Sequence, residues 1–134
     1  MNTNDANVTD KLIYRKLSYL ITGLCFDIHN ELGRFAKEKQ YCDLLEEKLK
    51  LAKIVYKREY KINDTGNIID FLIEDKILLE IKAKRLILKI DFYQTQRYLQ
   101  SLGIKLGMIL NFRNRYLKPI RIIKIDTDAR NKYK

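Results

Sequence analysis

Two acidic residues and a lysine near the middle of the chain have the types and spacing that metal-assisted hydrolysis requires. Asp70 lies ten residues before Glu80, and Lys82 follows Glu80 by two positions. On a β-strand, residues two apart share a face, so Glu80 and Lys82 lie together while Ile81 points the other way. Two carboxylates can bind a hard divalent cation such as Mg²⁺ or Mn²⁺, which polarises water for attack on a phosphodiester.

The residues around both acids are isoleucine, leucine and phenylalanine, which makes an unpaired charge there costly. A buried carboxylate must find a partner or take up a proton. A divalent ion satisfies both acids at once, with the backbone carbonyl of Ile81 as a further ligand. Lys82 would then lie beside the activated water or the phosphate and offset charge in the transition state. The alternative is a surface salt bridge, because a Glu-x-Lys pattern often occurs by chance.

A third acid falls on the core-facing side of a predicted helix. Glu38 is spaced by three, seven and eleven positions from Tyr41, Leu45 and Leu49, which places all four on one helical stripe. Glu38 is therefore a candidate to join the two strand acids. The alternative is a first-turn acid that complements the helix dipole without facing the site.

Two polar residues on a later predicted helix complete the candidate site. Gln94 and Tyr98 are four positions apart, and Ile90 lies one turn earlier. Residues four apart lie on one side of a helix, so the pair forms a polar notch on an otherwise apolar face. A glutamine there can orient a water molecule or a phosphate. The alternative for Gln94 is an ordinary surface amide.

The elements that must position these residues follow from hydrophobic periodicity. Apolar residues three and four apart predict a helix from Lys11 that ends or kinks at Gly33. The spacing then predicts helices over 36–52 and 87–101, with strands over 53–61, 67–73, 76–82, 105–112 and 116–125. Pro119 indicates an edge strand, because proline cannot donate a ladder hydrogen bond.

This element order predicts an α/β fold, in which helices flank a mixed β-sheet. We expect a disordered segment over residues 1–10, a single domain over 11–125 and a polar tail over 126–134. Apolar residues make up 46% of the chain, which is enough for one core of this size.

The charge balance favours a polyanionic partner. The chain has 27 lysines and arginines against 17 acids, for a formal charge of +10. Such an excess suggests nucleic acid or an anionic membrane surface, although many small basic proteins bind neither. The sequence has no apolar run of 18 residues and no signal-peptide pattern, so we expect no membrane span and a cytoplasmic protein. Cys25 and Cys42 are then expected to be reduced thiols.

These motifs together resemble a known family. Asp70, Glu80-Ile81-Lys82 and Gln94-x-x-x-Tyr98 are similar to the PD-(D/E)XK nuclease superfamily, including the Q-x-x-x-Y element of its recombination-nuclease branch. More narrowly, Glu38-x-x-Tyr41, residues 28–33 and residues 78–83 resemble the small GxxExxY proteins assigned to that superfamily. The resemblance covers about residues 21–125.

The resemblance implies a restriction-endonuclease-like core of order α-β-β-β-α-β, Mg²⁺-type ions and hydrolysis of phosphodiesters in DNA or RNA. It makes Asp70 and Glu80 metal ligands and Lys82 the catalytic lysine, and it adds Glu38 as an extra acid. Gln94 and Tyr98 then support the site.

Three positions depart from the GxxExxY pattern. Phe35 replaces its first glycine, Arg34 replaces a common proline, and Asp91 replaces a histidine that often precedes the glutamine. Two alternatives to a nuclease stay open: a non-catalytic nucleic-acid-binding module, and an assembly subunit that has lost its substrate. A homodimer is a further possibility, because so small a domain needs a second copy to grip a duplex.

Overall fold

Residues 13–126 form three helices and five strands in the computed structural model of the protein. The predicted segments over 1–10 and 126–134, apart from Asp126, and the predicted helix start at Lys11 lie outside the described residues. The elements are α2 (Arg15–Leu32), α3 (Glu38–Leu51), β1 (Tyr56–Lys61), β2 (Ile68–Ile73), β3 (Ile77–Lys82), α4 (Lys89–Leu102), β4 (Leu106–Asn111) and β5 (Ile120–Ile123).

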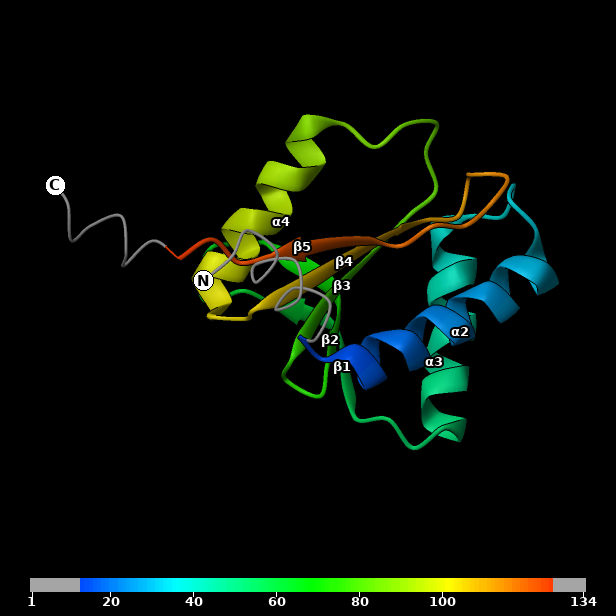
Figure 1. Ribbon diagram of the computed structural model, residues 1–134, viewed down its shortest axis with the longest axis horizontal. Coiled ribbons are helices and arrows are strands. Elements are labelled where there is room, and N and C mark those ends of the chain that lie inside the picture. Colours follow the sequence, from blue (N-terminus) through cyan, green and yellow to red (C-terminus); the bar gives the residue numbers. More distant parts are fainter. Residues whose placement is uncertain (1–12, 127–134) are drawn as a thin grey trace, which may run out of the picture.

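The five strands form one sheet in the order β1-β2-β3-β4-β5. All neighbouring strands are antiparallel except β3 and β4, which are parallel and are joined through α4. The helices α2 and α3 lie on one side of the sheet and α4 on the other (Figure 1). The predicted mixed sheet flanked by helices is therefore confirmed.

Helices α2 and α3 bury the stripes that their sequences predict. Tyr41, Leu45 and Leu49 of α3 are fully buried against α2 and one face of the sheet. Gly33 ends α2 with a φ of 74°, a left-handed conformation that glycine adopts without a steric penalty. The Gly33 N–H donates to the carbonyl of His29 at 2.9 Å, which caps the helix. This cap fixes where the chain turns toward α3 and Glu38.

Strand β3 is buried on both faces, and its side chains alternate between two cores. Ile77, Leu79 and Ile81 pack toward α2 and α3, whereas Leu78 packs in the cluster beneath α4. Because side chains alternate along a strand, Glu80 and Lys82 lie on the α4 side of the sheet. The sheet thus carries the predicted Glu-x-Lys pair at the C-terminal end of its central strand.

The structure shortens three predicted elements for local reasons. Lys53 has a φ of 57° just after α3, so β1 begins at Tyr56 rather than at residue 53. Helix α4 begins at Lys89, where the Asp91 carboxylate accepts the N–H of Leu88 at 2.7 Å. Strand β5 starts only after Pro119, and it is an edge strand as the proline predicts.

Gly107 lets α4 approach the sheet closely. A Cβ added at Gly107 would lie 2.8 Å from Cγ2 of Thr95 on α4. We expect Gly107→Ala to lower the free energy of unfolding by about 1–3 kcal/mol, because the helix must shift or the core must strain. Urea unfolding measures this, with Gly23→Ala as the matched control. No atom lies within 4 Å of a Cβ at Gly23, which is inside α2, so this control is expected to leave stability unchanged or raise it. Equal effects of the two alanines would contradict the packing argument.

No helix within residues 13–126 is long and apolar enough to cross a membrane.

Candidate functional site

The site forms where β2 and β3 separate. Their last paired residues are Phe71 and Leu79, so the backbone of Ile81 has no partner on β2 beyond that point. The Asp70 carboxylate fills this place, because its Oδ2 accepts the Ile81 N–H at 2.7 Å. The hydrogen bond fixes the Asp70 side chain against β3 at the end of the sheet.

Glu80 lies beside Asp70 and is only 5% exposed. Burial raises the pKa of Glu80 well above its ordinary value, and the Asp70 charge and a hydrogen bond with the Asp70 side chain raise it further. Lys82 opposes this shift with its positive charge. Burial and the neighbouring Asp70 carboxylate therefore favour the protonated form of Glu80.

The backbone of Ile81 also faces the Asp70 side. In a strand, successive residues direct their backbone groups to opposite neighbours. The Lys82 carbonyl accepts the Phe112 N–H at 2.9 Å and so faces β4, which leaves the Ile81 N–H and carbonyl directed away from β4. The predicted carbonyl ligand thus lies on the same side as the acidic pair.

Glu38 begins α3 and lies across a hollow of about 270 Å³ that Asp70 also lines. Burial raises the pKa of Glu38, and the Asp70 charge adds to this, while Lys82 and Lys84 oppose it. Glu38 is thus electrically coupled to the site. It does not complete a compact metal cluster, because no three His, Cys, Asp or Glu side chains within residues 13–126 are grouped closely enough to hold an ion.

Helix α4 brings Tyr98 to the other side of Glu80. Tyr98 is buried, and its pKa is raised first by burial and then by the Glu80 charge. Its hydroxyl is therefore neutral at neutral pH. Gln94 lies half-buried one turn earlier on α4. The predicted notch of these two residues stays a prediction, and Ile90 is exposed and does not pack beneath it.

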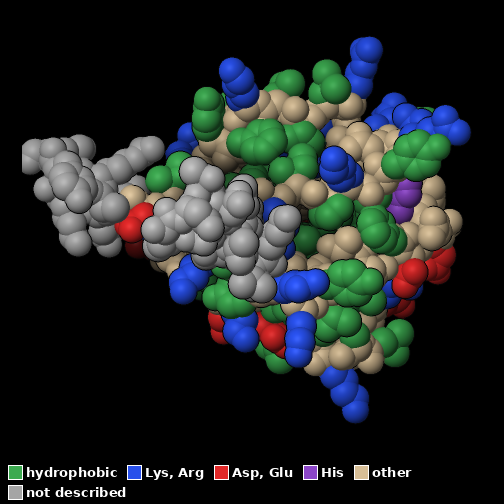
Figure 2. All heavy atoms as spheres, viewed as in Figure 1, with side chains coloured by type: hydrophobic (Ala, Val, Ile, Leu, Met, Phe, Trp, Pro, Cys, Tyr) green, Lys and Arg blue, Asp and Glu red, His purple; other side chains and the backbone are tan. Residues whose placement is uncertain are grey.

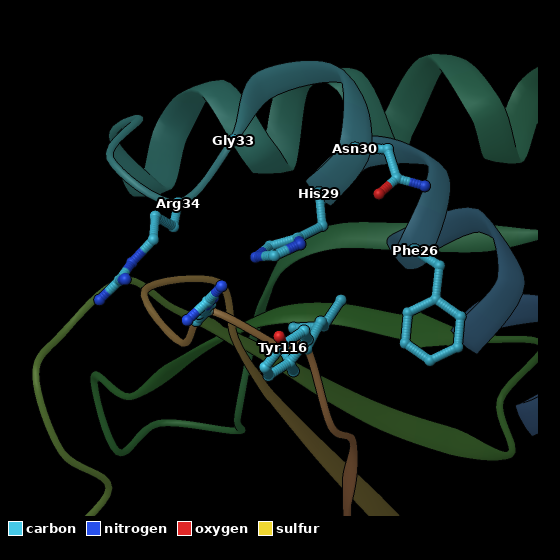
Figure 3. Close-up of a pocket in the computed structure, with 8 residues that line it drawn as sticks. Phe26, His29, Asn30, Gly33, Arg34 and Tyr116 are labelled. Carbon is cyan, nitrogen blue, oxygen red and sulfur yellow. The ribbon is translucent and has the colours of Figure 1, made fainter.

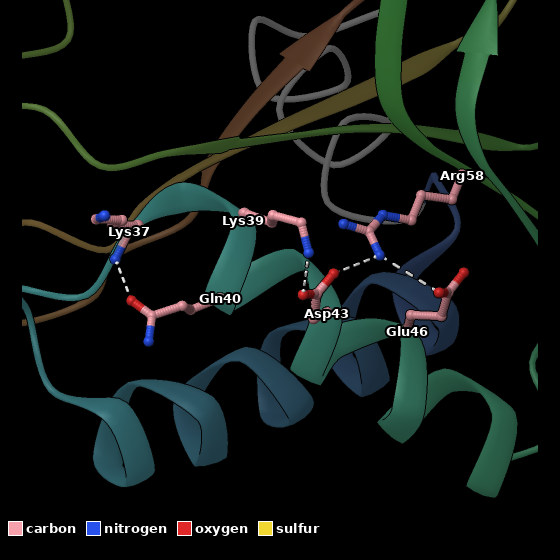
Figure 4. Close-up of polar contacts among 6 residues, drawn as sticks. All are labelled: Lys37, Lys39, Gln40, Asp43, Glu46 and Arg58. Carbon is pink, nitrogen blue, oxygen red and sulfur yellow. Dashed lines mark hydrogen bonds and ion pairs between the residues drawn. The ribbon is translucent and has the colours of Figure 1, made fainter.

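Cys42 and Arg58 line the same hollow as Glu38, and sequence reasoning missed both as neighbours of the site. The Arg58 guanidinium binds Asp43 at 2.7 Å and Glu46 at 3.3 Å, which ties β1 to α3 (Figure 4). A signal was available, because Arg58 lies two positions from Tyr56 and two from Tyr60 and is half-buried as they are. Burial raises the pKa of the Cys42 thiol to about 12, with a further rise from the Asp70 charge.

A second missed group supports the chain just after Lys82. Asn111 is buried on β4, and its Nδ2 donates to the Lys84 carbonyl at 2.7 Å. Its Oδ1 accepts the Lys84 N–H at 3.1 Å. The Lys84 ammonium in turn binds the buried Asp91 carboxylate at 2.6 Å. Burial tends to raise the pKa of Asp91, but Lys84 and the Leu88 N–H outweigh it and lower the pKa.

We expect Asn111→Ala to lower the free energy of unfolding by about 2 kcal/mol, because it leaves both backbone groups of Lys84 without their buried partner. Any cleavage activity should fall with it, since residues 83–88 then lose their anchor beside Lys82. Asn67→Ala, an exposed position just before β2, is the control. Urea unfolding and cleavage rates measure both effects, and unchanged stability would contradict the anchoring role.

The donors gathered here suit a hard divalent ion. Mg²⁺ in proteins takes one or two carboxylates and completes its shell with water. Asp70, Glu80 and the Ile81 carbonyl offer oxygen ligands only, and burial together with the Asp70 charge raises the pKa of Glu80, so a bound cation would favour its charged form. No cysteine or histidine is needed, in keeping with the preference of such ions for oxygen.

Comparison with known proteins identifies the family. A model of the PD-(D/E)XK nuclease superfamily matches residues 15–123, which include every element from α2 to β5. Searches of curated proteins and of solved structures found no match. Because the match spans most of the chain and includes all the site residues named above, the chain belongs to the PD-(D/E)XK nuclease superfamily.

Proposed function

We propose that the protein hydrolyses phosphodiester bonds in DNA or RNA with the help of Mg²⁺ or Mn²⁺. The contact between Asp70 and Glu80 at the end of the central strands carries this proposal. A cation would balance the two carboxyl groups there, and Lys82 stands close enough for its charge to act on Glu80 and on Glu38. Superfamily membership supports a nuclease-like activity.

Each residue has a role that its position supports. Asp70, Glu80 and the Ile81 carbonyl would hold the ion. When bound, such an ion polarises a phosphoryl oxygen and makes a neighbouring water more acidic. Lys82, whose charge acts on Glu80, balances the negative charge that grows on the phosphate during attack.

The remaining residues shape the site. Glu38 lines the same hollow as Asp70 and can accept a proton from the attacking water, directly or through a second water. The neutral Tyr98 hydroxyl and the Gln94 amide can donate hydrogen bonds from the α4 side. These roles follow the Q-x-x-x-Y and E-x-x-Y elements, and we place the chain among the GxxExxY proteins on those residues.

A basic surface supports nucleic acid as the substrate. The formal charge is +10, and basic and hydrophobic side chains interleave across the face shown in Figure 2. Such a mixture suits contacts to phosphates and to bases without reading sequence. The proposal places the protein in the cytoplasm, where its two thiols would stay reduced. Association into a homodimer stays a prediction, which sedimentation velocity checks.

The decisive experiment measures cleavage of plasmid, single-stranded DNA and RNA with Mg²⁺, with Mn²⁺ and with EDTA. Lys82→Ala is expected to lower the rate by about a hundredfold or more, because it removes the charge beside the reacting phosphate. Lys76→Ala, at the opposite end of β3, is the matched control and should act like wild type. Cleavage that survives both Glu80→Ala and Lys82→Ala would overturn the proposal.

A non-catalytic nucleic-acid-binding module is the second candidate, and the basic surface alone favours it. This module predicts salt-dependent binding without turnover. Calorimetry separates the two functions, because the module needs no metal ion. The absence of heat from millimolar Mg²⁺ or Mn²⁺ would favour the module.

A further inference from the structure

A second hollow, of about 630 Å³, lies between the C-terminal half of α2 and the loop that joins β4 to β5. Its size falls within the range of roughly 300–1,000 Å³ typical of small-ligand sites. Phe26 and His29 reach from α2 toward Tyr116 on the loop (Figure 3). Neither the acidic pair nor Lys82 lines this hollow.

The hollow contains two large aromatic side chains that are exposed. Tyr116 is 76% exposed and Phe26 is 43% exposed, although both are large apolar side chains. The Arg115 guanidinium lies 5.3 Å from the Tyr116 ring. Exposed aromatic rings beside arginine are the surface on which unpaired bases stack.

The charge of the hollow selects an anion. Arg34 and Arg115 line it together with His29 and Asn30, and no acidic residue among residues 13–126 lines it. Arginine binds a phosphate through two donors at once, and the side-chain amide of an asparagine adds a single hydrogen bond. A group with both an aromatic ring and a phosphate matches this lining.

Hydrogen bonds between α2 and the loop hold the hollow in shape. His29 Nε2 donates to the carbonyl of Asn114 at 2.9 Å. Arg34 Nε donates to the carbonyl of Arg113 at 3.0 Å. Both bonds join chain segments about 80 residues apart, so the two walls are fixed relative to each other before a ligand arrives.

The chain connects this hollow to the acidic site. Strand β4 pairs its last residue, Asn111, with Lys82, and the loop that carries Tyr116 follows directly. On the other wall, Phe35 lies between Arg34 and Glu38 in sequence and is 71% exposed. Arginine groups lie 4.9 Å and 4.8 Å from the Phe35 ring, which extends the cationic and aromatic surface toward α3.

We propose that this hollow binds one unpaired nucleotide of a single-stranded nucleic acid. Its base stacks on Tyr116 and Phe26, and its phosphate pairs with Arg34 and Arg115. The inference rests on the proposed function in one respect, because it identifies the bound strand as the substrate of the nuclease. The substrate class would then be single-stranded nucleic acid. Base stacking and phosphate binding are common to DNA and RNA, so the test includes both.

The test measures binding without cleavage. Fluorescence anisotropy in EDTA measures the affinity of the full chain for three labelled ligands: a 12-nucleotide oligothymidine, an oligouridine of the same length and a 12-base-pair duplex. We expect a single strand to bind more tightly than the duplex. Tyr116→Leu should weaken single-strand binding by about tenfold, because it removes one stacking platform. Its exposure means that folding should be unaffected, which circular dichroism checks.

Matched controls separate stacking from general surface effects. Tyr19→Leu removes an equally exposed tyrosine, at 79%, from the same helix as Phe26 and should change affinity less than twofold. An abasic 12-mer should bind wild type and Tyr116→Leu equally. Arg115→Gln should reduce the salt slope by about 0.7, the effect of one phosphate contact to a single strand. Lys105→Gln, next to the opposite end of β4, should leave the salt slope unchanged.

Equal effects of Tyr116→Leu and Tyr19→Leu, or an undiminished effect of Tyr116→Leu on the abasic strand, would overturn the inference. Dependence on Tyr116 with either oligothymidine or oligouridine supports it, and the tighter of the two identifies the sugar. The outcome of the metal-dependent cleavage assay is independent of this binding test. Tyr116-dependent binding without cleavage would support the hollow as a binding site and refute the nuclease proposal. Cleavage with binding that does not depend on Tyr116 would support the nuclease proposal and refute the binding site.

Discussion

Replacing Glu80 with glutamine is expected to abolish metal-dependent cleavage and, at the same time, to stabilise the metal-free protein. Cleavage should fall on the order of a thousandfold, because an ion held at the site supplies several kcal/mol of transition-state stabilisation. Stability should rise because glutamine keeps the size of Glu80 but cannot ionise beside the Asp70 carboxylate. Loss of activity with a gain in stability is typical of a functional residue rather than a structural one.

The gain in stability should depend on pH. The folded-state pKa of Glu80 is raised from its ordinary value of 4.5 to about 9, so the folded state holds this proton more tightly than the unfolded state. The stability that Glu80 contributes is therefore fully present below pH 4.5 and is lost as the pH rises toward 9, by at most about 1.4 kcal/mol per unit. Glu80→Gln lacks this loss, so its advantage should be larger at pH 8 than at pH 5.

Urea unfolding in EDTA at several pH values measures the advantage, and cleavage rates measure the loss. Glu47→Gln, on the exposed face of α3, is the control and should change neither quantity. A Glu80→Gln protein that is less stable than wild type at pH 8 would show that the acidic pair stabilises the fold. Such a result would remove the main support for a cation site.

Metal affinity should rise steeply with pH, by about a hundredfold between pH 6 and pH 8. Burial and the Asp70 charge keep Glu80 protonated over this range, and an ion must displace that proton to use the carboxylate. Displacement of one proton per ion gives about a tenfold rise in affinity for each pH unit. The effect is large because the two carboxyl groups are in contact.

Calorimetric titration with Mn²⁺ in buffers of different ionisation enthalpy counts the released protons directly. We expect close to one proton per ion for wild type at pH 7. Glu80→Gln should release almost none and should bind weakly at every pH. Affinity that does not change with pH in wild type would show that Glu80 is not displaced by the ion and that the ligand assignment is wrong.

The positions of Glu80 and Lys82 follow from short-range rules that a sequence displays. Alternation along an apolar strand places them on one face, and the structure shows Ile81 packed on the other. The mixed sheet was predictable for a similar reason, since three strands followed by one helix and another strand leave few topologies. Helix ends marked by Gly33 and Gly103 were also visible in the sequence.

What the sequence does not display is where two paired strands part. The ladder of β2 and β3 ends at Phe71 and Leu79, and nothing in the period of either strand marks that position. The bond from Ile81 to Asp70 exists only because of this separation. Periodicity therefore predicted that both acids are near each other but not that one of them is also a backbone partner.

Glu38 shows the limit of a helical stripe. The stripe directs Glu38 toward Asp70, with which it lines one hollow, but the stripe does not say how deeply Glu38 is buried. Glu38 is the first residue of α3, so it lies at the rim, exposed, while Tyr41 one turn later is buried. Asn111 and Asp91 were missed for another reason, since their partners are backbone groups of residues 84 and 88 that only the folded chain brings near.

The burial of Cys42 beside Asp70 has a consequence for how this protein reacts with thiol reagents. With a pKa of about 12, only about one Cys42 in ten thousand is a thiolate at pH 8, and the thiolate is the reactive form. Cys25 is fully buried and its pKa is raised too. Alkylation must therefore wait for α3 to move away from the sheet. The half-life of Cys42 labelling is therefore expected to report how often the hollow lined by Glu38 and Asp70 opens.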